Sequence, residues 1–192
     1  MGVDPADTEL QRLLRSELAC VGVDVELHGA RTGYVMSDNI EGAKDAVRHL
    51  HALGHRRIAT ITGLLDKKPG ADRLRGYRDA FGELGLAYRD EYVIQGDFYF
   101  EAGHDGARRL LALDEPPTAI FAASDMTAIG AVRGAVEAGR DVPDDLSVVG
   151  FDDIQMAQHV HPPLTTVRQA KSGLGGAAGA ALLRQIDGSD ST

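Results

Sequence analysis

The chain is poor in cysteine, lacks tryptophan and contains no long apolar run, and these absences exclude several classes of protein. Cys20 is the single cysteine among 192 residues, which excludes an intrachain disulfide and fits a reducing compartment. No stretch approaches the roughly 20 consecutive apolar residues that a membrane-spanning helix needs. The first nine residues are acidic and polar rather than basic and apolar, unlike a secretory signal. We therefore predict a cytoplasmic chain with no membrane segment.

Basic residues are also scarce. The chain carries 20 lysines and arginines against 29 acidic residues, a net charge of −9. A protein that neutralises several phosphates of a nucleic acid is expected to present a basic face. The arginine clusters here are only pairs, Arg56 with Arg57 and Arg108 with Arg109. This composition predicts that the chain does not bind nucleic acid by itself and that its partner is small and polar.

Apolar strands alternate regularly with amphipathic helices in the middle of the chain. Strands are expected at 57–62, 92–96, 118–123 and 146–151, and helices at 72–84, 101–113 and 124–138. This alternation predicts an α/β fold with a doubly wound parallel sheet. Near-continuous apolar strands such as Ile120–Ala123 and Val148–Phe151 agree with it, because parallel strands are covered on both faces.

The flanking segments are less regular. Before the alternation we expect a helix at 8–18, strands at 20–27 and 34–36, and a helix that starts near Asp38 and stops at Gly54; after it, an irregular helix at 153–159, a strand at 164–169 and a helix at 172–186. The break after Phe151 indicates that the chain crosses into a second lobe. The end, 187–192, is rich in Gly, Ser and Asp and is expected to fray.

Polar and aromatic side chains follow the carboxyl ends of the predicted strands. They are Arg73, Phe98, Ser124 and Asp152, with Asp125 and Asp153 beside the last two. In an open parallel sheet these ends line one crevice. An arginine donates paired hydrogen bonds, a carboxylate accepts them, and an aromatic ring covers the flat face of a sugar or base. The pattern predicts a binding site for a polyhydroxylated or heteroaromatic ligand.

Several of these residues also have a simpler structural interpretation. Ser124 has the position of a helix cap, Asp153 that of a turn residue, and Phe98 that of a core residue. Arg73 and Asp152 are harder to explain structurally, because both would lie near a buried crevice.

Other candidate motifs point to structure rather than chemistry. His51 and His55 are four residues apart, but no third ligand completes a zinc site, and the same holds for His159 and His161. The glycines of 173–179 have the wrong spacing for a dinucleotide loop and favour a closely packed helix face. No nucleophile has a matching base and orienting group. We predict no metal, no cofactor and no enzymatic activity.

Several motifs occur together and in order between about residue 34 and residue 170. They are DNIEGA (38–43), LHALGHRRIA (50–59), RLRGY (73–77), GDF (96–98), PTAIFAASD (117–125), the segment 144–153, and PPLTTVRQ (162–169). At these residues the chain resembles the LacI/GalR family of transcriptional regulators.

The resemblance implies a periplasmic-binding-protein-like fold of two Rossmann-like lobes that clamp a ligand. By resemblance, residues 1–40 belong to the first lobe, 41–161 to the second, and 162–188 return to the first, followed by a tail at 189–192. Arg73, Phe98, Ser124 and Asp152 match the family's ligand-contacting positions. The implied effector is a sugar, with a purine as the alternative.

The resemblance also implies a homodimer whose surface includes Ile129, Arg133, His159 and Val160. Operator DNA would be bound only through a helix-turn-helix domain, which this sequence does not contain. The family's hinge helix, most of its first lobe and its final strands are also absent from the sequence. Two alternatives stay open: a periplasmic sugar-binding protein of a transporter, and a sugar-modifying hydrolase on the same fold.

Overall fold

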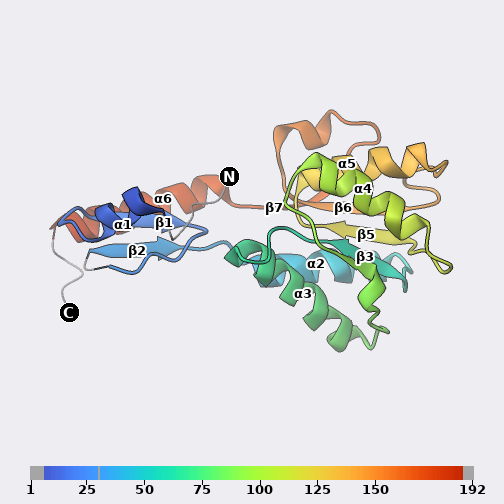
Figure 1. The fold of residues 1–192 in the computed structure, drawn as a ribbon, viewed down its shortest axis with the longest axis horizontal. Helices are drawn as coiled ribbons and strands as arrows, with labels where there is room; N and C mark the ends of the chain where they lie inside the picture. The colour runs from blue at the N-terminus through green and yellow to red at the C-terminus, as the bar shows by residue number, and fades with distance from the viewer. Residues whose placement is uncertain (1–6, 30, 188–192) are drawn as a thin grey trace. The chain divides into compact units, whose positions relative to one another are not determined.

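The computed structural model describes residues 7–29 and 31–187 and divides the chain into two compact units (Figure 1). Unit 2 comprises residues 38–169, and unit 1 comprises 1–37 together with 170–192. The predicted tail from 188 onward lies outside the described residues.

Unit 2 is built on a five-stranded sheet in the order β4-β3-β5-β6-β7, with every neighbouring pair parallel. Its strands are β3 (Ile58–Ile61), β4 (Val93–Ile94), β5 (Ala119–Ala122), β6 (Ser147–Asp152) and β7 (Thr165–Arg168). Strand β3 pairs with β4 on one side and β5 on the other, so the chain winds outward in both directions. The predicted doubly wound parallel sheet is confirmed.

Helices cover both faces of this sheet, as Figure 1 shows. They are α2 (Asn39–Ala52) and α3 (Lys68–Leu84) on one face, and α4 (Phe100–Leu111) and α5 (Asp125–Glu137) on the other. Each helix pair buries its own apolar cluster against the strands: Ile58 and Phe121 face α2 and α3, whereas Ile61 and Ile120 face α4 and α5. Two short 3₁₀ helices complete the unit, η1 (Asp90–Tyr92) and η2 (Gln155–Gln158).

The start of α3 is four residues earlier than predicted. The sequence pattern places it at Asp72, but the helix begins at Lys68, with Pro69 in its first turn. Proline fits there because the first helical N–H groups have no partner within the helix. The other end is as expected, with Gly85 at φ 63° closing the helix, a conformation that favours glycine.

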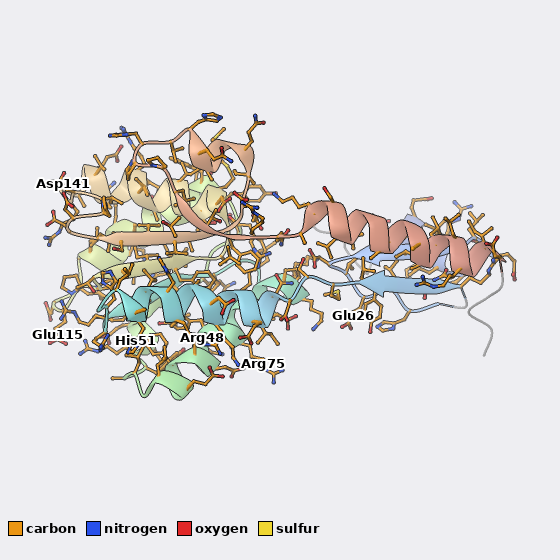
Figure 2. All side chains as sticks on the ribbon, turned by 180° about the vertical axis from the view of Figure 1, so that it is seen from behind. Glu26, Arg48, His51, Arg75, Glu115 and Asp141 are labelled. Atoms are coloured by element: carbon orange, nitrogen blue, oxygen red, sulfur yellow. The ribbon has the colours of Figure 1, made fainter. Side chains whose placement is uncertain are left out.

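Charged side chains join α2 to α3 at the surface. Arg48, labelled on α2 in Figure 2, pairs with Glu41 on its own helix and donates to Glu83 of α3 at 2.7 Å. Lys44 reaches the other oxygen of Glu83 at 2.6 Å. Hydrogen bonds from Lys44 and Arg48 hold the pKa of the Glu83 carboxyl below its usual value. Lys44 and Arg48 are therefore neutralised locally and do not form a basic face.

Unit 1 is smaller. It contains α1 (Thr8–Leu14), β1 (Cys20–Val23), β2 (Thr32–Val35) and α6 (Lys171–Asp187). The two strands pair in parallel, and α6 lies against both. The Arg31 guanidinium ties the sheet to the helix by donating to the Gln185 carbonyl at 2.5 Å. Helix α1 and strand β1 are each four residues shorter than predicted, and of the described residues of this unit only Gly22 is buried.

The division between the units falls at 37/38 and 169/170. Strand β7 belongs to unit 2 because it pairs with β6, up to Asp152 opposite Arg168. The lobe boundaries at 40 and 161 that the family resemblance implies for this chain stay a prediction.

Candidate ligand-binding site

The four predicted ligand-contacting residues all lie at the carboxyl edge of the unit 2 sheet. Asp152 is the last residue of β6, and Ser124 lies between β5 and α5. Phe98 lies between β4 and α4, and Arg73 is on α3, which follows β3. The structure therefore brings together residues that are up to 79 positions apart.

Arg73 is buried, with 4% of its surface exposed, and its guanidinium is held on several sides. Nε donates to Asn39 Oδ1 at 2.8 Å, and Nη1 donates to the Ala123 carbonyl and to Asp152 Oδ1, the latter at 3.3 Å. The Phe151 ring lies under it, 3.7 Å from ring centroid to Cζ. A buried charge needs such partners, so contacts within the chain fix the orientation of Arg73.

Asp152 presents a carboxylate at this edge from an unusual backbone conformation. Its φ is 121°, and that of Asp153 is 52°, a region that costs residues other than glycine about 1–3 kcal/mol each. The turn aims Asp152 at Arg73 while leaving 25% of its side chain exposed. Asp153 takes a different partner, Arg168 Nε at 2.6 Å. The two adjacent carboxylates thus diverge.

Ser124 and Phe98 are coupled to each other. Ser124 is the N-cap of α5, as predicted: its Oγ accepts from the Thr127 N–H at 3.1 Å. The same hydroxyl donates to the Phe98 carbonyl at 2.8 Å, where Phe98 has φ 76°. The half-buried Phe98 ring lies against Gly63, where an added Cβ would come within 2.0 Å of the ring. Ser124 therefore fixes the backbone that carries the aromatic ring.

Sequence reasoning missed the residues that support these four. Asn39 is 1% exposed and holds Arg73, but the sequence shows it only as part of a helix start. Gly63 makes room for the Phe98 ring; its signal is a glycine just beyond a strand, where backbone or side chains often approach closely. Asp125 is expected beside Ser124 at the strand ends, but the sequence does not show that its carboxylate is fully buried.

The four residues predicted at a dimer surface lie on α5 and just after η2. Ile129 and Val160 are partly exposed and His159 is exposed. The Arg133 guanidinium is 62% exposed and pairs with Glu137 at 2.7 Å. Apolar side chains that the sequence analysis did not single out are exposed on the same two elements: Met126, Val136 and Met156, at 37%, 53% and 52%. On α5 the positions 126, 129, 133 and 136 share one helix face.

The histidine pair does not form a metal site. His55 uses both ring nitrogens on hydroxyls, Nδ1 with Thr118 Oγ1 at 2.9 Å and Nε2 with Ser147 Oγ at 3.0 Å. Burial lowers the pKa of His55. Within residues 7–29 and 31–187, no three His, Cys, Asp or Glu side chains are grouped so that they could hold a metal ion. Over the same residues, no helix has the length and apolar character required to cross a membrane.

A pocket of about 160 Å³ lies away from the candidate site. Its lining includes Ser147 and Val148 at the start of β6, Leu164 and Thr165 at the start of β7, and Leu50 of α2. It therefore opens at the amino edge of the sheet, and it contains none of the four predicted ligand-contacting residues.

Comparison with known protein families agrees with this architecture. The profile of the family described as "Periplasmic binding protein-like domain" matches residues 47–192, which is most of the chain. The match includes all four residues of the candidate site.

Curated relatives are transcriptional regulators. The chain is 42% identical to the HTH-type transcriptional repressor CytR of Escherichia coli K12 over 151 residues, 79% of this chain and 44% of the relative. It is 40% identical to the regulator CelR of Thermobifida fusca over 158 residues, 82% of this chain and 46% of the relative. The chain thus spans about half the length of the curated relatives it matches.

Solved structures give the same result. A CelR–cellobiose complex is 38% identical, with a TM-score of 0.82 over 88% of this chain and 52% of that one. A LacI-family regulatory protein from Chloroflexus aggregans is 34% identical, with a TM-score of 0.87 over 97% of this chain and 67% of that one. With its parallel α/β architecture and these relatives, the chain belongs to the periplasmic binding protein-like domain family, in the form found in LacI-family transcriptional regulators.

Proposed function

We propose that this chain is the effector-sensing and dimerisation part of a LacI-type transcriptional regulator that acts in the cytoplasm, and that its effector is a sugar. Operator DNA would be bound by a helix-turn-helix domain outside this chain, in keeping with the net charge of −9. Effector and operator would then change each other's affinity by the same factor, because coupling between two binding sites is reciprocal.

The observation that carries the proposal is the fixed pair of Arg73 and Asp152 beside Phe98. The pair offers a charged donor and a charged acceptor, which make the stronger hydrogen bonds in proteins. The Phe98 ring lies 5.7 Å from Arg73 Cζ and supplies an aromatic face next to them. Donor, acceptor and ring together suit a polyhydroxylated ring, whose hydroxyls donate and accept and whose C–H face packs on aromatics. Two regulators similar to this chain support a sugar: CelR in its complex with cellobiose, and the ribose operon repressor.

A thermal-shift screen tests the effector. The chain would be screened with cellobiose, ribose, other sugars, sugar phosphates and nucleobases, because a ligand of the folded state raises the melting temperature by mass action. Asp152→Asn keeps the shape but removes the charge, and it should weaken the binding of any hit by about ten- to a hundredfold. Asp145→Asn, at an exposed position before β6, is the matched control. A hit that Asp152→Asn leaves unchanged would remove this edge as the binding site.

We also propose that the exposed apolar face of α5 is the dimer surface, together with the residues after η2. Two-fold symmetry of a dimer would match a palindromic operator. Ile129→Asp places a charge on this face and should shift the chain toward monomer in sedimentation velocity. Leu53→Asp, at the 63% exposed C-cap of α2, is the matched control. If Ile129→Asp sediments like the unmodified chain, α5 is not the dimer surface.

A further inference from the structure

Asp125 is a fully buried carboxylate on which three segments of unit 2 converge. It is the first residue of α5 and has no exposed surface. Oδ2 accepts from the Ile154 N–H at 2.8 Å, just beyond β6, and Oδ1 accepts from Thr166 Oγ1 at 2.5 Å, in β7. Hydrogen bonds to an ionised group are roughly twice as strong as neutral ones. One side chain therefore joins α5, the turn after β6, and β7.

The turn that Asp125 holds is the one that aims Asp152. Asp152 and Asp153 both have positive φ, and such strained residues persist only where their surroundings fix them. Asp125 holds the residue after them through Ile154 N–H. Thr166 Oγ1, itself bound to Asp125, accepts from the Asp153 N–H at 3.4 Å. Asp125 thus restrains the strained pair from the next residue, Ile154, which it holds directly, and at Asp153 through Thr166.

Gly150 leaves room for this carboxylate. A Cβ added at Gly150 would lie 2.4 Å from Asp125 Oδ1 and 3.0 Å from Leu164 Cδ2. The glycine is therefore required by the packing of Asp125 over β6 rather than by its own backbone conformation. In the motif Gly150-Phe151-Asp152-Asp153, Gly150 therefore leaves room for the Asp125 carboxylate, and Asp125 in turn orients Asp152.

We propose that Asp125 is a positioning residue for effector binding: it holds Asp152 toward the ligand and ties that carboxylate to α5 and to β7. The part that concerns the effector rests on the proposed function. Helix α5 carries the proposed dimer surface, and β7 leads out of unit 2. A ligand bound to Asp152 therefore acts on both elements through the buried side chain of Asp125.

Thr166 offers the sharpest test, because its hydroxyl can be removed without changing its shape. Thr166→Val keeps the volume and loses the donor to Asp125, whereas Thr166→Ser keeps the donor. Thr165→Val makes the same change at the exposed neighbouring position. Asp125→Asn is the direct variant; Thr166→Val keeps the test valid if Asp125→Asn does not fold.

The first readout is amide hydrogen exchange on the protein without ligand. Thr166→Val and Asp125→Asn should speed exchange at Asp153 and Ile154 by about tenfold or more, the factor that corresponds to losing one charge-assisted hydrogen bond. Amides of β3 and β5 should keep their protection, which distinguishes a loosened turn from general destabilisation. Thr166→Ser and Thr165→Val should behave like the unmodified chain. Unchanged exchange at both amides in Thr166→Val would overturn the proposal.

The second readout is the affinity for cellobiose, or for whichever compound the thermal-shift screen identifies. Thr166→Val should weaken binding about tenfold and Thr166→Ser should restore it; equal affinities would refute the positioning role even if the turn exchanges faster. If the unmodified chain binds none of the compounds, the proposed function loses its support, while the exchange experiment still decides whether Asp125 holds the turn.

Discussion

The two units use the same kinds of element but differ sharply in burial. Unit 2 encloses its sheet between two helical layers, with an apolar cluster on each face. Unit 1 has two parallel strands with helices α1 and α6, yet of its described residues only Gly22 is buried. Large apolar side chains of unit 1 are exposed: Leu13, Leu18, Val23, Tyr34, Leu183 and Ile186.

This difference shows that regular secondary structure and the free energy of folding have different origins. Hydrogen bonds and propensity suffice to define the elements of both units, but buried apolar surface contributes roughly 25 cal/mol per Å² and dominates the free energy of folding. A two-stranded sheet is marginal in water without further strands or a packed face. We therefore expect unit 2 to unfold as the cooperative core of the chain and unit 1 to contribute little to its free energy of unfolding.

The largest expected contrast comes from removing the same side chain in each unit. Leu110→Ala empties a fully buried position on α4 and should cost about 2–5 kcal/mol. Leu183→Ala changes a 61% exposed position on α6 and should stay within about 0.5 kcal/mol. Urea unfolding followed by circular dichroism measures both. A cost for Leu183→Ala as large as that for Leu110→Ala would mean that unit 1 has a cooperative core of its own.

A pair of glycines sharpens the comparison by testing close packing. Gly130 of α5 lies against α4, and an added Cβ would come within 2.0 Å of the Phe100 carbonyl oxygen. Gly130→Ala should therefore cost about 1–3 kcal/mol through overpacking. Among the described residues, nothing lies within 4 Å of the same position at Gly179 of α6, so Gly179→Ala should stabilise α6 by about 0.5–1 kcal/mol. A destabilising Gly179→Ala would indicate that α6 packs more tightly than its exposure suggests.

Two partly buried histidines of unit 2 extend the comparison to groups whose pKa values shift in opposite directions, and here the expected effect is the smallest. Burial lowers the pKa of His55, so its contribution is present above the unfolded pKa of about 6.5 and is lost as pH falls through the folded value. Hydrogen bonds to Glu137 and Asp105 raise the pKa of His104. Its contribution is present below about pH 6.5 and is lost as pH rises through the folded value.

Melting temperatures from roughly pH 5 to 8, where histidine titrates, would separate these contributions. Relative to the unmodified chain, His55→Gln should reduce the loss of stability on the acidic side, and His104→Gln should reduce the loss as pH rises above about 6.5. If the two variants changed the pH profile in the same direction, one of the two histidine environments would be misassigned.

The sequence predicts the fold of unit 2 well because the information is local. Continuous apolar runs identify β5 and β6, and helical spacing identifies α2 to α5, so the parallel sheet follows from their alternation. The predicted start of α3 is wrong because Lys67, the residue before the helix, offers no side-chain cap. The signal that the prediction does not use is Pro69 in the first turn. In unit 1 the pattern predicts β1 and α1 too long, because only Gly22 is buried among the described residues of this unit and little packing supports longer elements.

The candidate site is only partly readable from sequence. The carboxyl ends of the strands point to Arg73 and Asp152, since topology alone brings such ends together. The supporting hydrogen bonds join residues that are far apart in the sequence. Asn39 and Arg73 are 34 residues apart, and Asp125 and Thr166, which hold the turn after Asp152, are 41 residues apart. Such pairs depend on side-chain geometry across the sheet and leave no periodic signal. Ligand contact by Arg73, Phe98, Ser124 and Asp152 stays a prediction.

The positive φ angles of Phe98, Asp152 and Asp153 have a consequence for engineering. Glycine would relieve the backbone at all three positions, and selection for heat resistance alone should favour it most at Asp153, whose partner Arg168 is exposed. At Asp152 glycine would also take a partner from the buried Arg73. Selection for response to an effector should retain the ring and the carboxylates, a conflict between stability and activity that is common at functional sites. A thermostabilised version of this chain should therefore take its improvements elsewhere, and the carboxyl edge of the sheet should be left unaltered.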